Sequence, residues 1–399
     1  MQKYDSYKDS GIQWLGEIPS HWKLRKMKYT FSERSQKGFP NEPLLAATQN
    51  HGVIKKSDYE NRTVEAMKNL DTLKLVEEGD FVISLRSFQG GIEYSYCRGI
   101  ISPAYTVLKA HHLTESYFKH LAKSPIFIDL LKSTVTGIRE GQNIDYNKLR
   151  VEFLPIPPIE EQQAIASYLD TATAKIDEAI AQQQKMIDLL NERKQIIINN
   201  AVTKGLNPNA KMKPSGIQWL GEIPSHWEVA PLKYCMKLNN GRDYKEYESN
   251  NGIPVIGTGG QFAYSDKEMF NGEVVFFGRK GTIDKPFHYK GAFWAVDTVF
   301  YAEAKSNMIC RYLYYLGTTI PYGLYSTSTA IPSMTQTDLL NNPISLPPLS
   351  EQQAIASYLD TATAQIDQAI AQQQKMTKLL QERKQIIIND VVTGKVKVV

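Results

Sequence analysis

The chain has 399 residues, of which 42% are hydrophobic and 22% are charged, and its net charge is +4. This length can bury two cores, and the mild positive charge is compatible with nucleic acid without by itself indicating it. Three cysteines without metal-ligand spacing exclude a disulfide framework, and the lack of any membrane-length apolar run predicts a cytoplasmic protein with no membrane contact.

The chain contains two copies of one frame. Ser10–Trp22 reads SGIQWLGEIPSHW and recurs unchanged as Ser215–Trp227. Glu161–Leu190 recurs as Glu351–Leu380 with four changes. The inserts between these blocks share little sequence. A duplicated frame around two different inserts indicates one scaffold that presents two readers to a target that is itself roughly two-fold.

The repeats divide the chain into six segments. In chain order these are the N-terminal repeat block (1–22), the first insert (23–158), the first long repeated helix (159–204), a linker with the second repeat block (205–227), the second insert (228–348), and the second long repeated helix with a C-terminal tail (349–399).

The two inserts share a weak skeleton. Gly79–Arg86 and Gly272–Arg279 both read as a turn, a buried strand and an arginine at the strand end. Gly99–Thr106 and Gly291–Thr298 match in length, and a short helix is expected after each. We therefore predict two small α+β domains, with Arg86 and Arg279 at equivalent strand ends.

Polar, glycine-rich loops of the inserts are candidate DNA contacts. Arg, Gln, Asn, Ser and Thr side chains can read base edges, Lys can hold phosphates, and glycine allows close backbone approach. Such loops are also common without a ligand, and the arginines could instead form structural ion pairs. The candidates are Arg86, Ser87, Gln89, Arg139, Gln142, Asn143, Gln261, Arg279, Lys280, Thr282, Thr327 and Ser328.

The repeated segments after the inserts predict two long helices. Glu160 to Val202 contains neither Gly nor Pro, and Pro157, Pro158 and Gly205 supply start and stop signals. Each helix would be about 60 Å long, at about 1.5 Å per residue. Apolar residues at a 3-4 spacing form a coiled-coil seam, whose main members are Ile165, Leu169, Ile176, Met186, Leu190, Ile355, Leu359, Ile366, Met376 and Leu380.

Because the best matching seam is the other copy, we expect the two helices to pair within the chain as an antiparallel coiled coil. Gln183 and Gln373 would lie in mid-seam, where a polar residue can fix the register. Two alternatives are that each helix packs on its own domain, or that two chains form a homodimeric coiled coil.

Catalytic motifs are missing from the sequence. It has no G-x-x-x-x-G-K-S/T phosphate loop, no dinucleotide fingerprint, and no Asn-Pro-Pro-aromatic tetrapeptide of the kind that amino-methyltransferases use. No carboxylate or cysteine stands at metal-ligand spacing from a histidine, so we expect neither catalytic residues nor a metal site. Trp14, Trp22, Trp219 and Trp227 are expected to anchor the frame or to dock a partner.

The blocks IPSHW, then IPP or LPP followed by x-x-EQ-x-AIA-x-YLD, and the long Gln- and Ile-rich helices resemble the specificity subunit of type I restriction–modification enzymes. The resemblance covers essentially the whole chain. It implies that each insert is a target-recognition domain that reads one half of a bipartite, asymmetric DNA site. It also implies that the coiled coil sets the spacer between the half-sites and docks the modification subunits.

By the same resemblance this chain has no catalysis and binds no cofactor. Two modification subunits would supply S-adenosylmethionine and adenine methylation, and restriction subunits bound through them would use ATP and Mg. A fused methyltransferase–nuclease and a coiled-coil scaffold without a nucleic-acid role are the alternatives.

The order of the copied blocks predicts where the chain ends lie. The block Ser215–Trp227 follows the first long helix, whereas Ser10–Trp22 has no helix before it. If the frame is symmetric, Ser10–Trp22 lies beside the end of the second helix, and the two chain ends lie near each other.

Overall fold

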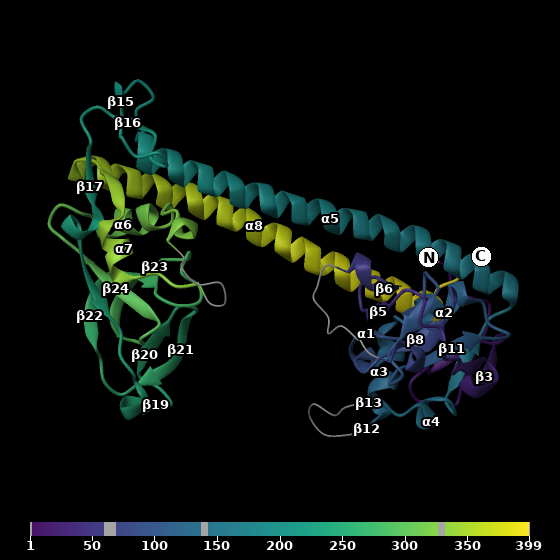
Figure 1. Cartoon of the computed structure of the whole chain (residues 1–399). Coiled ribbons are helices and arrows are strands. Elements are labelled where there is room, and N and C mark those ends of the chain that lie inside the picture. Colours follow the sequence, from purple (N-terminus) through teal and green to yellow (C-terminus); the bar gives the residue numbers. More distant parts are fainter. Residues whose placement is uncertain (1, 60–68, 137–142, 326–331, 399) are drawn as a thin grey trace. The chain divides into compact units, whose positions relative to one another are not determined.

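The computed structural model describes residues 2–59, 69–136, 143–325 and 332–398 (Figure 1). The chain divides into two compact units: unit 1 comprises Met1–Gln183 with Lys375–Val399, and unit 2 comprises Gln184–Gln374. This division cuts both long helices, so each unit holds the start of one helix and the end of the other. In the described part of the chain, no helix combines the length and the apolar character needed to cross a bilayer.

The two long helices are α5 (Ile159–Lys204) and α8 (Leu349–Val392). Each begins directly after a Pro-Pro pair, because a proline is tolerated at a helix start and excluded from its interior. Gly205 (φ +73°) follows α5 closely and Gly394 (φ +76°) follows α8. This left-handed backbone is typical of residues just past a helix end. The predicted helices are therefore confirmed.

The helices pair antiparallel inside each unit. In unit 2, Lys194 of α5 binds Asp367 of α8 at 2.7 Å; in unit 1, Lys384 of α8 binds the copy-related Asp177 of α5 at 2.6 Å. Exposed ion pairs of this kind contribute at most about 1 kcal/mol each, so they specify register more than stability. Pairing within the chain is confirmed. Each helix packs on its own insert only at its start.

The buried stripe of α5 differs from the predicted seam. Ile165, Ile176, Ile187 and Ile198 are all buried, whereas Met186 is 47% exposed. Their 11-residue repeat corresponds to about 3.67 residues per turn, close to a straight α-helix, while a strict seven-residue repeat drifts around the helix. The assignment of Met186 and its copy Met376 to the seam was wrong. Among the other predicted members, Leu169, Ile355 and Leu359 are buried and Leu190, Ile366 and Leu380 are half-buried.

Unit 1 contains a four-stranded antiparallel sheet in the order β4 (Phe31–Arg34), β11 (Thr106–Ala110), β8 (Phe81–Ile83) and β9 (Glu93–Tyr94). Two-stranded ladders surround it: β1 (Tyr7–Asp9) with β2 (Glu17–Pro19), β3 (Lys23–Lys26) with β14 (Phe153–Ile156), β5 (Leu45–Thr48) with β6 (Gly52–Lys55), β7 (Lys74–Val76) with β10 (Gly99–Ile101), and β12 (Val135–Thr136) with β13 (Asn143–Ile144). The short helices are α1 (Ser87–Gly90), α2 (Glu115–Leu121), α3 (Pro125–Ser133) and α4 (Tyr146–Leu149).

Unit 2 contains a seven-stranded sheet in the order β18 (Met236–Asn240), β24 (Val299–Ala304), β22 (Phe270–Gly278), β23 (Phe287–Ala295), β20 (Ile253–Gly257), β21 (Gly260–Ser265) and β19 (Glu248–Ser249). Its ladders are β15 (Met212–Pro214) with β16 (Glu222–Pro224), and β17 (Glu228–Pro231) with β25 (Pro343–Leu346). Its short helices are α6 (Cys310–Gly317) and α7 (Gln336–Asn341). The α+β class is confirmed.

The two inserts share the order of four strands, because β18, β24, β22 and β23 of unit 2 correspond to β4, β11, β8 and β9 of unit 1. Gly99–Ile101 forms β10 and pairs with β7, whereas Gly291 lies in β23 and pairs with β22. The proposed match between Gly99–Thr106 and Gly291–Thr298 was therefore wrong.

The register also corrects the match of the two arginines. Phe31 pairs with Ala110, and Met236, its counterpart after the copied block, pairs with Ala304. Counting along these strands makes Ile83 equivalent to Phe277, because Ile83 pairs with Thr106 and Phe277 with Phe300. Arg86 therefore corresponds to Lys280, one residue beyond Arg279.

Each core includes a repeat block, the start of one long helix and the end of the other. In unit 1, Trp22 packs in one cluster with Ile165 and Leu169 of α5 and with Val391 and Val392 of α8. In unit 2, the equivalent cluster contains Trp227, Ile355, Leu359, Ala201 and Val202. Trp22 and Trp227 are fully buried, so their predicted role as anchors is confirmed.

A glutamate near the start of each long helix holds the copied block. The Trp22 indole N–H donates to Glu161 at 3.0 Å, His21 contacts the same carboxylate at 2.8 Å, and the Tyr4 hydroxyl also donates to it. In unit 2, Trp227 donates to Glu351 at 3.0 Å and His226 contacts it at 2.6 Å.

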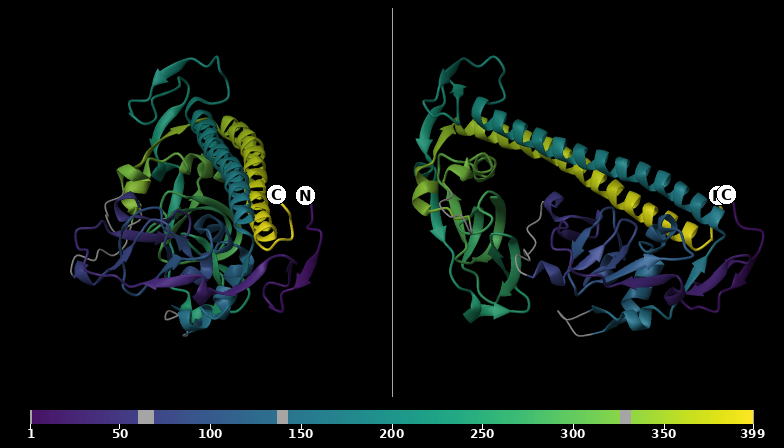
Figure 2. Two further views of the ribbon diagram at one scale, coloured as in Figure 1. Left: turned by 90° about the vertical axis from the view of Figure 1, so that its right-hand side faces the viewer. Right: turned by 45° about the vertical axis from the view of Figure 1, so that its right-hand side comes forward.

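The two ends of the chain pair with each other in unit 1. Gln2 and Lys397 form an antiparallel bridge in which the Lys397 N–H donates to the Gln2 carbonyl at 2.9 Å. The Tyr7 hydroxyl donates to the Gly394 carbonyl at 3.1 Å. Figure 2 shows the two ends side by side. The expected position of Ser10–Trp22 beside the end of the second helix is confirmed.

Glu161→Gln is expected to loosen the first repeat block, because it removes the negative charge that strengthens the bonds from Trp22 and Tyr4 to one oxygen and puts an amide group where His21 contacts the other. A charge-assisted bond of this kind contributes about 1.5–3 kcal/mol, equivalent to about ten-fold or more in hydrogen-exchange protection. Exchange should rise in peptides from 4–22 and stay unchanged in 212–227. The matched change Glu351→Gln should give the reverse pattern, and a smaller effect because the Glu351 side chain is 39% exposed. Equal effects of both variants on both peptides would contradict this assignment.

A circular permutant is expected to fold. Because Gln2 already pairs with Lys397, a short linker from Val399 to Met1 should close the frame without strain, and a new start near Asn207 opens an exposed loop. Circular dichroism and thermal unfolding should match those of the parent chain. The control is the parent chain, in its original order, with the same linker added after Val399. If this control folds and the permutant does not, the cyclic frame is refuted.

Candidate nucleic-acid interface

Three loops of unit 2 meet at one end of its sheet. They are the tip of the β20–β21 hairpin, the residues after β22, and the β23–β24 turn. The Arg279 N–H donates to the Thr298 carbonyl at 2.8 Å, and the Val296 N–H donates to the Ile256 carbonyl at 3.0 Å. A pocket of about 590 Å³ lies at this end, lined by Asp243, Tyr244, Gly257, Thr258, Gly259, Gly260, Phe262, Val296, Asp297 and Thr298.

Arg279 is half-buried at this end of the sheet. One guanidinium N–H donates to the Asp297 carbonyl at 3.3 Å, and the guanidinium lies 5.8 Å from the centre of the Phe300 ring. Among the described residues, no carboxylate forms an ion pair with Arg279. These contacts therefore do not support the alternative that Arg279 forms a structural ion pair. Its guanidinium is held in position and carries five N–H donors, which suits an anionic or base-edge acceptor.

The other described candidates of unit 2 lie in or next to the same loops. Lys280 and Thr282 are exposed in the loop after β22, where Lys280 forms a bridge with Ser333. Gln261 is exposed at the start of β21, and the neighbouring Phe262 ring is 58% exposed. Exposed aromatic rings beside polar donors are suited to stacking on bases. Sequence reasoning missed Phe262 and Tyr244, because aromatic residues in loops are not separable from core aromatics by pattern alone.

In unit 1, the candidates around α1 separate into two kinds. Arg86 and Gln89 are exposed, with Arg86 at the N-terminal boundary of the helix. Ser87 is only 1% exposed, and its hydroxyl accepts from the Ser84 N–H at 2.9 Å. Naming Ser87 as a DNA contact was therefore wrong, since its hydroxyl holds the turn that orients Arg86. Asn143 is exposed in β13. Arg139, Gln142, Thr327 and Ser328 lie outside the described residues.

A groove of about 1730 Å³ lies in unit 1 between the insert and the paired helices. Gln89 lines it, together with His51, Lys123, Asp177 and Lys384. Its charges are largely paired: Lys123 binds Glu93 at 2.7 Å, and Lys119 and His120 both contact Asp170 at 2.9 Å. Burial lowers the pKa of His120, which favours its neutral form. The groove is therefore suited to a polar partner surface more than to a phosphate backbone.

An apolar stripe on each long helix faces solvent. Residues at copy-related positions are between 47% and 59% exposed: Met186, Leu189 and Ile196 on α5, and Met376, Leu379 and Ile386 on α8. Exposed apolar stripes of this kind mark helix-docking surfaces. The sequence pattern placed the methionines in the seam and missed the leucines and isoleucines. An error of half a helical turn in the position of the seam moves a residue from the buried face of the helix to its solvent-exposed face.

Residues 224–376 match the protein family described as the type I restriction modification DNA specificity domain. Over 437 residues the chain is 25% identical to a Methanocaldococcus jannaschii protein assigned as the MjaX type I restriction enzyme specificity subunit, covering 96% of each chain. It is 26% identical over 365 residues to the MjaVIII type I restriction enzyme specificity subunit of the same organism, covering 81% of this chain and 80% of that one.

A solved structure has the same fold. That structure comes from work on complex assembly and conformational transition of the type I R-M system. Its chain aligns with the present one with a TM-score of 0.71, over 95% of the present chain and 99% of its own length. The two sequences are 15% identical, so this similarity is evidence of fold alone.

Arg279→Ala is expected to weaken binding to a duplex that contains the recognition site by about 5- to 150-fold, corresponding to about 1–3 kcal/mol for a lost base-edge contact. Lys280→Ala should weaken binding to all sequences and lower the salt dependence by about one ion. Fluorescence anisotropy over a salt series measures both quantities.

The matched control is Lys237→Ala. Lys237 is an exposed lysine that pairs with Glu303, toward the opposite end of the same sheet from Arg279. It should leave binding unchanged. If Arg279→Ala bound like this control, the arginine would only support the β23–β24 turn.

Proposed function

We propose that this chain is a specificity subunit of a type I restriction–modification enzyme and selects the DNA sequence on which that enzyme acts; the family match over residues 224–376 and the similar specificity subunits support this. Each insert domain, 23–158 and 228–348, reads one half of a bipartite, asymmetric site. One observation carries this proposal: the same four-strand order, on the same frame contacts, presents different loops in the two units.

The loops support asymmetric reading. Unit 1 presents Arg86 and Gln89 around a short helix, whereas unit 2 presents Arg279 and Lys280 beside a glycine-rich hairpin tip. Different donors at the equivalent end of the same sheet favour different base-edge patterns. Backbone contacts would hold each domain in register on the duplex while these side chains select the sequence.

The paired helices α5 and α8 would set the spacer between the half-sites and dock two modification subunits. Their exposed apolar stripes support this role, because the same three-residue pattern occurs once on each helix. Two surfaces with the same apolar pattern in one chain are suited to two copies of one partner.

Catalysis would reside in the partners. The modification subunits would bind S-adenosylmethionine and methylate adenine, and the restriction subunits, attached through them, would use ATP and Mg. This division of labour agrees with the lack of nucleotide-binding motifs in the sequence. The complex would act on DNA in the cytoplasm.

Exchange of residues 23–155 for the insert of another family member should change one half-site and leave the other intact, because the main cores of the two units share no residue. Methylome sequencing of cells that carry the exchanged gene and its partners measures both half-sites together.

The reciprocal exchange of residues 228–343 is the matched control and should change the opposite half-site. If either exchange altered both half-sites, the two inserts could not be independent readers.

A further inference from the structure

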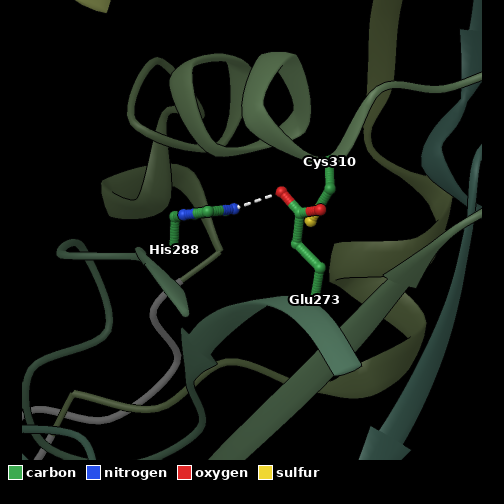
Figure 3. Close-up of side chains that lie close together, drawn as sticks. All are labelled: Glu273, His288 and Cys310. Carbon is green, nitrogen blue, oxygen red and sulfur yellow. Dashed lines mark hydrogen bonds and ion pairs between the residues drawn. The ribbon is translucent and has the colours of Figure 1, made fainter. Parts of the chain in front are cut away.

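Three potential metal ligands meet in unit 2, away from the loops described above. Glu273 lies on β22, His288 on β23, and Cys310 is the first residue of α6 (Figure 3). In the strand register His288 is opposite Val275, so Glu273 and His288 are diagonal neighbours on one face of the sheet. The His288 Nε2 and a Glu273 carboxylate oxygen are 2.7 Å apart, and all three ligand atoms lie within 4.8 Å of one another.

The donor set is that of a zinc-type ion. A thiolate, an imidazole and a carboxylate bind Zn²⁺ at about 2.0–2.3 Å, and soft sulfur selects against Mg²⁺ and Ca²⁺. The side chains of Glu273 and His288 are 41% and 19% exposed, so they can turn toward an ion. Their exposure also leaves an open side on which a water molecule can complete four-coordination.

Two cationic side chains border the cluster: the exposed Lys290, which pairs with Glu273 in the strand register, and Arg311. Arg311, the residue after the cysteine, binds Asp360 of α8 at 2.6 Å and stacks on Tyr314 and Tyr315, so its charge is already held elsewhere. Burial and the nearby Glu273 carboxylate raise the pKa of the Cys310 thiol to about 12. A divalent cation among these groups would reverse that effect, because it favours the thiolate.

We propose that Glu273, His288 and Cys310 bind one Zn²⁺ or a similar transition-metal ion, with water as the fourth ligand. Cys310 loses its proton to solvent on binding, and the new Zn–S, Zn–N and Zn–O bonds replace the water ligands of the hydrated ion, of which one stays bound. The ion joins the β22–β23 hairpin to α6, and Arg311 joins α6 to α8. The metal would thereby fix the sheet of the second insert on the long helix.

Unit 1 provides an internal comparison. Tyr117 of α2 donates to the Val392 carbonyl, and Tyr312 of α6 donates to the copy-related Val202 carbonyl. These two tyrosines are therefore equivalent, and counting back two residues makes Glu115 the counterpart of Cys310. Tyr94 pairs with Phe81 where His288 pairs with Val275, so a tyrosine replaces the histidine. Unit 1 therefore lacks this site, and the proposal requires one ion per chain.

The test uses the untagged full-length chain, freed of metal with a chelator and titrated with Zn²⁺ against a chromogenic competitor. The expected stoichiometry is one ion per chain. Co²⁺ in place of Zn²⁺ should give a thiolate-to-metal charge-transfer band. Cys310→Ser should abolish that band and weaken Zn²⁺ binding at least ten-fold.

Cys235→Ser is the matched control, since Cys235 is a buried cysteine of the same unit outside the cluster. It should bind as the parent chain does. His288→Gln, at a more exposed position, should also weaken binding and keeps the test valid if Cys310→Ser misfolds. Absent binding in the parent chain, or equal affinity in His288→Gln, would overturn the proposal. None of these measurements involves DNA, so they are independent of the proposed reading of half-sites.

Discussion

The structure depends on how each core is completed. The apolar end of α8, Val391 and Val392, fills the core of unit 1, and the apolar end of α5, Ala201 and Val202, fills the core of unit 2. A long helix thus contributes to the core in which it begins and to the core in which it ends. Neither unit has its full set of buried contacts without both helices, whichever insert completes the rest of its core.

The frame can therefore remain constant while the inserts diverge. The contacts of Glu161 with Trp22 and of Glu351 with Trp227 are nearly the same in the two units, although the neighbouring sheets have four and seven strands. The shared four-strand order fixes where the loops after β8 and β22 emerge. Sequence changes confined to those loops can alter what is read without changing how the domain is attached, which is the property that a specificity subunit requires.

Much of this arrangement was predictable because it depends on local signals. Pro-Pro pairs, Gly205 and the apolar spacing determine the long helices, and exact repetition identifies Trp22 and Trp227 as equivalent anchors. What could not be predicted depends on three-dimensional packing. The helix seam follows an 11-residue repeat, so Met186 is exposed; Ser87 is buried under a turn; and Arg86 is equivalent to Lys280 only through strand register. Glu273, His288 and Cys310 are far apart in sequence, and only the β22–β23 pairing and the docking of α6 bring them together.

The division into units also has a consequence for biosynthesis. Unit 2 is continuous, from Gln184 to Gln374, whereas unit 1 combines the first 183 residues with the segment after Lys375. As the chain emerges from the ribosome, the second insert can therefore complete its core before the first, although the first is synthesised earlier. Until Val391 and Val392 arrive, Trp22 and its neighbours lack their last partners. The first domain to be translated is thus the last whose core can be completed.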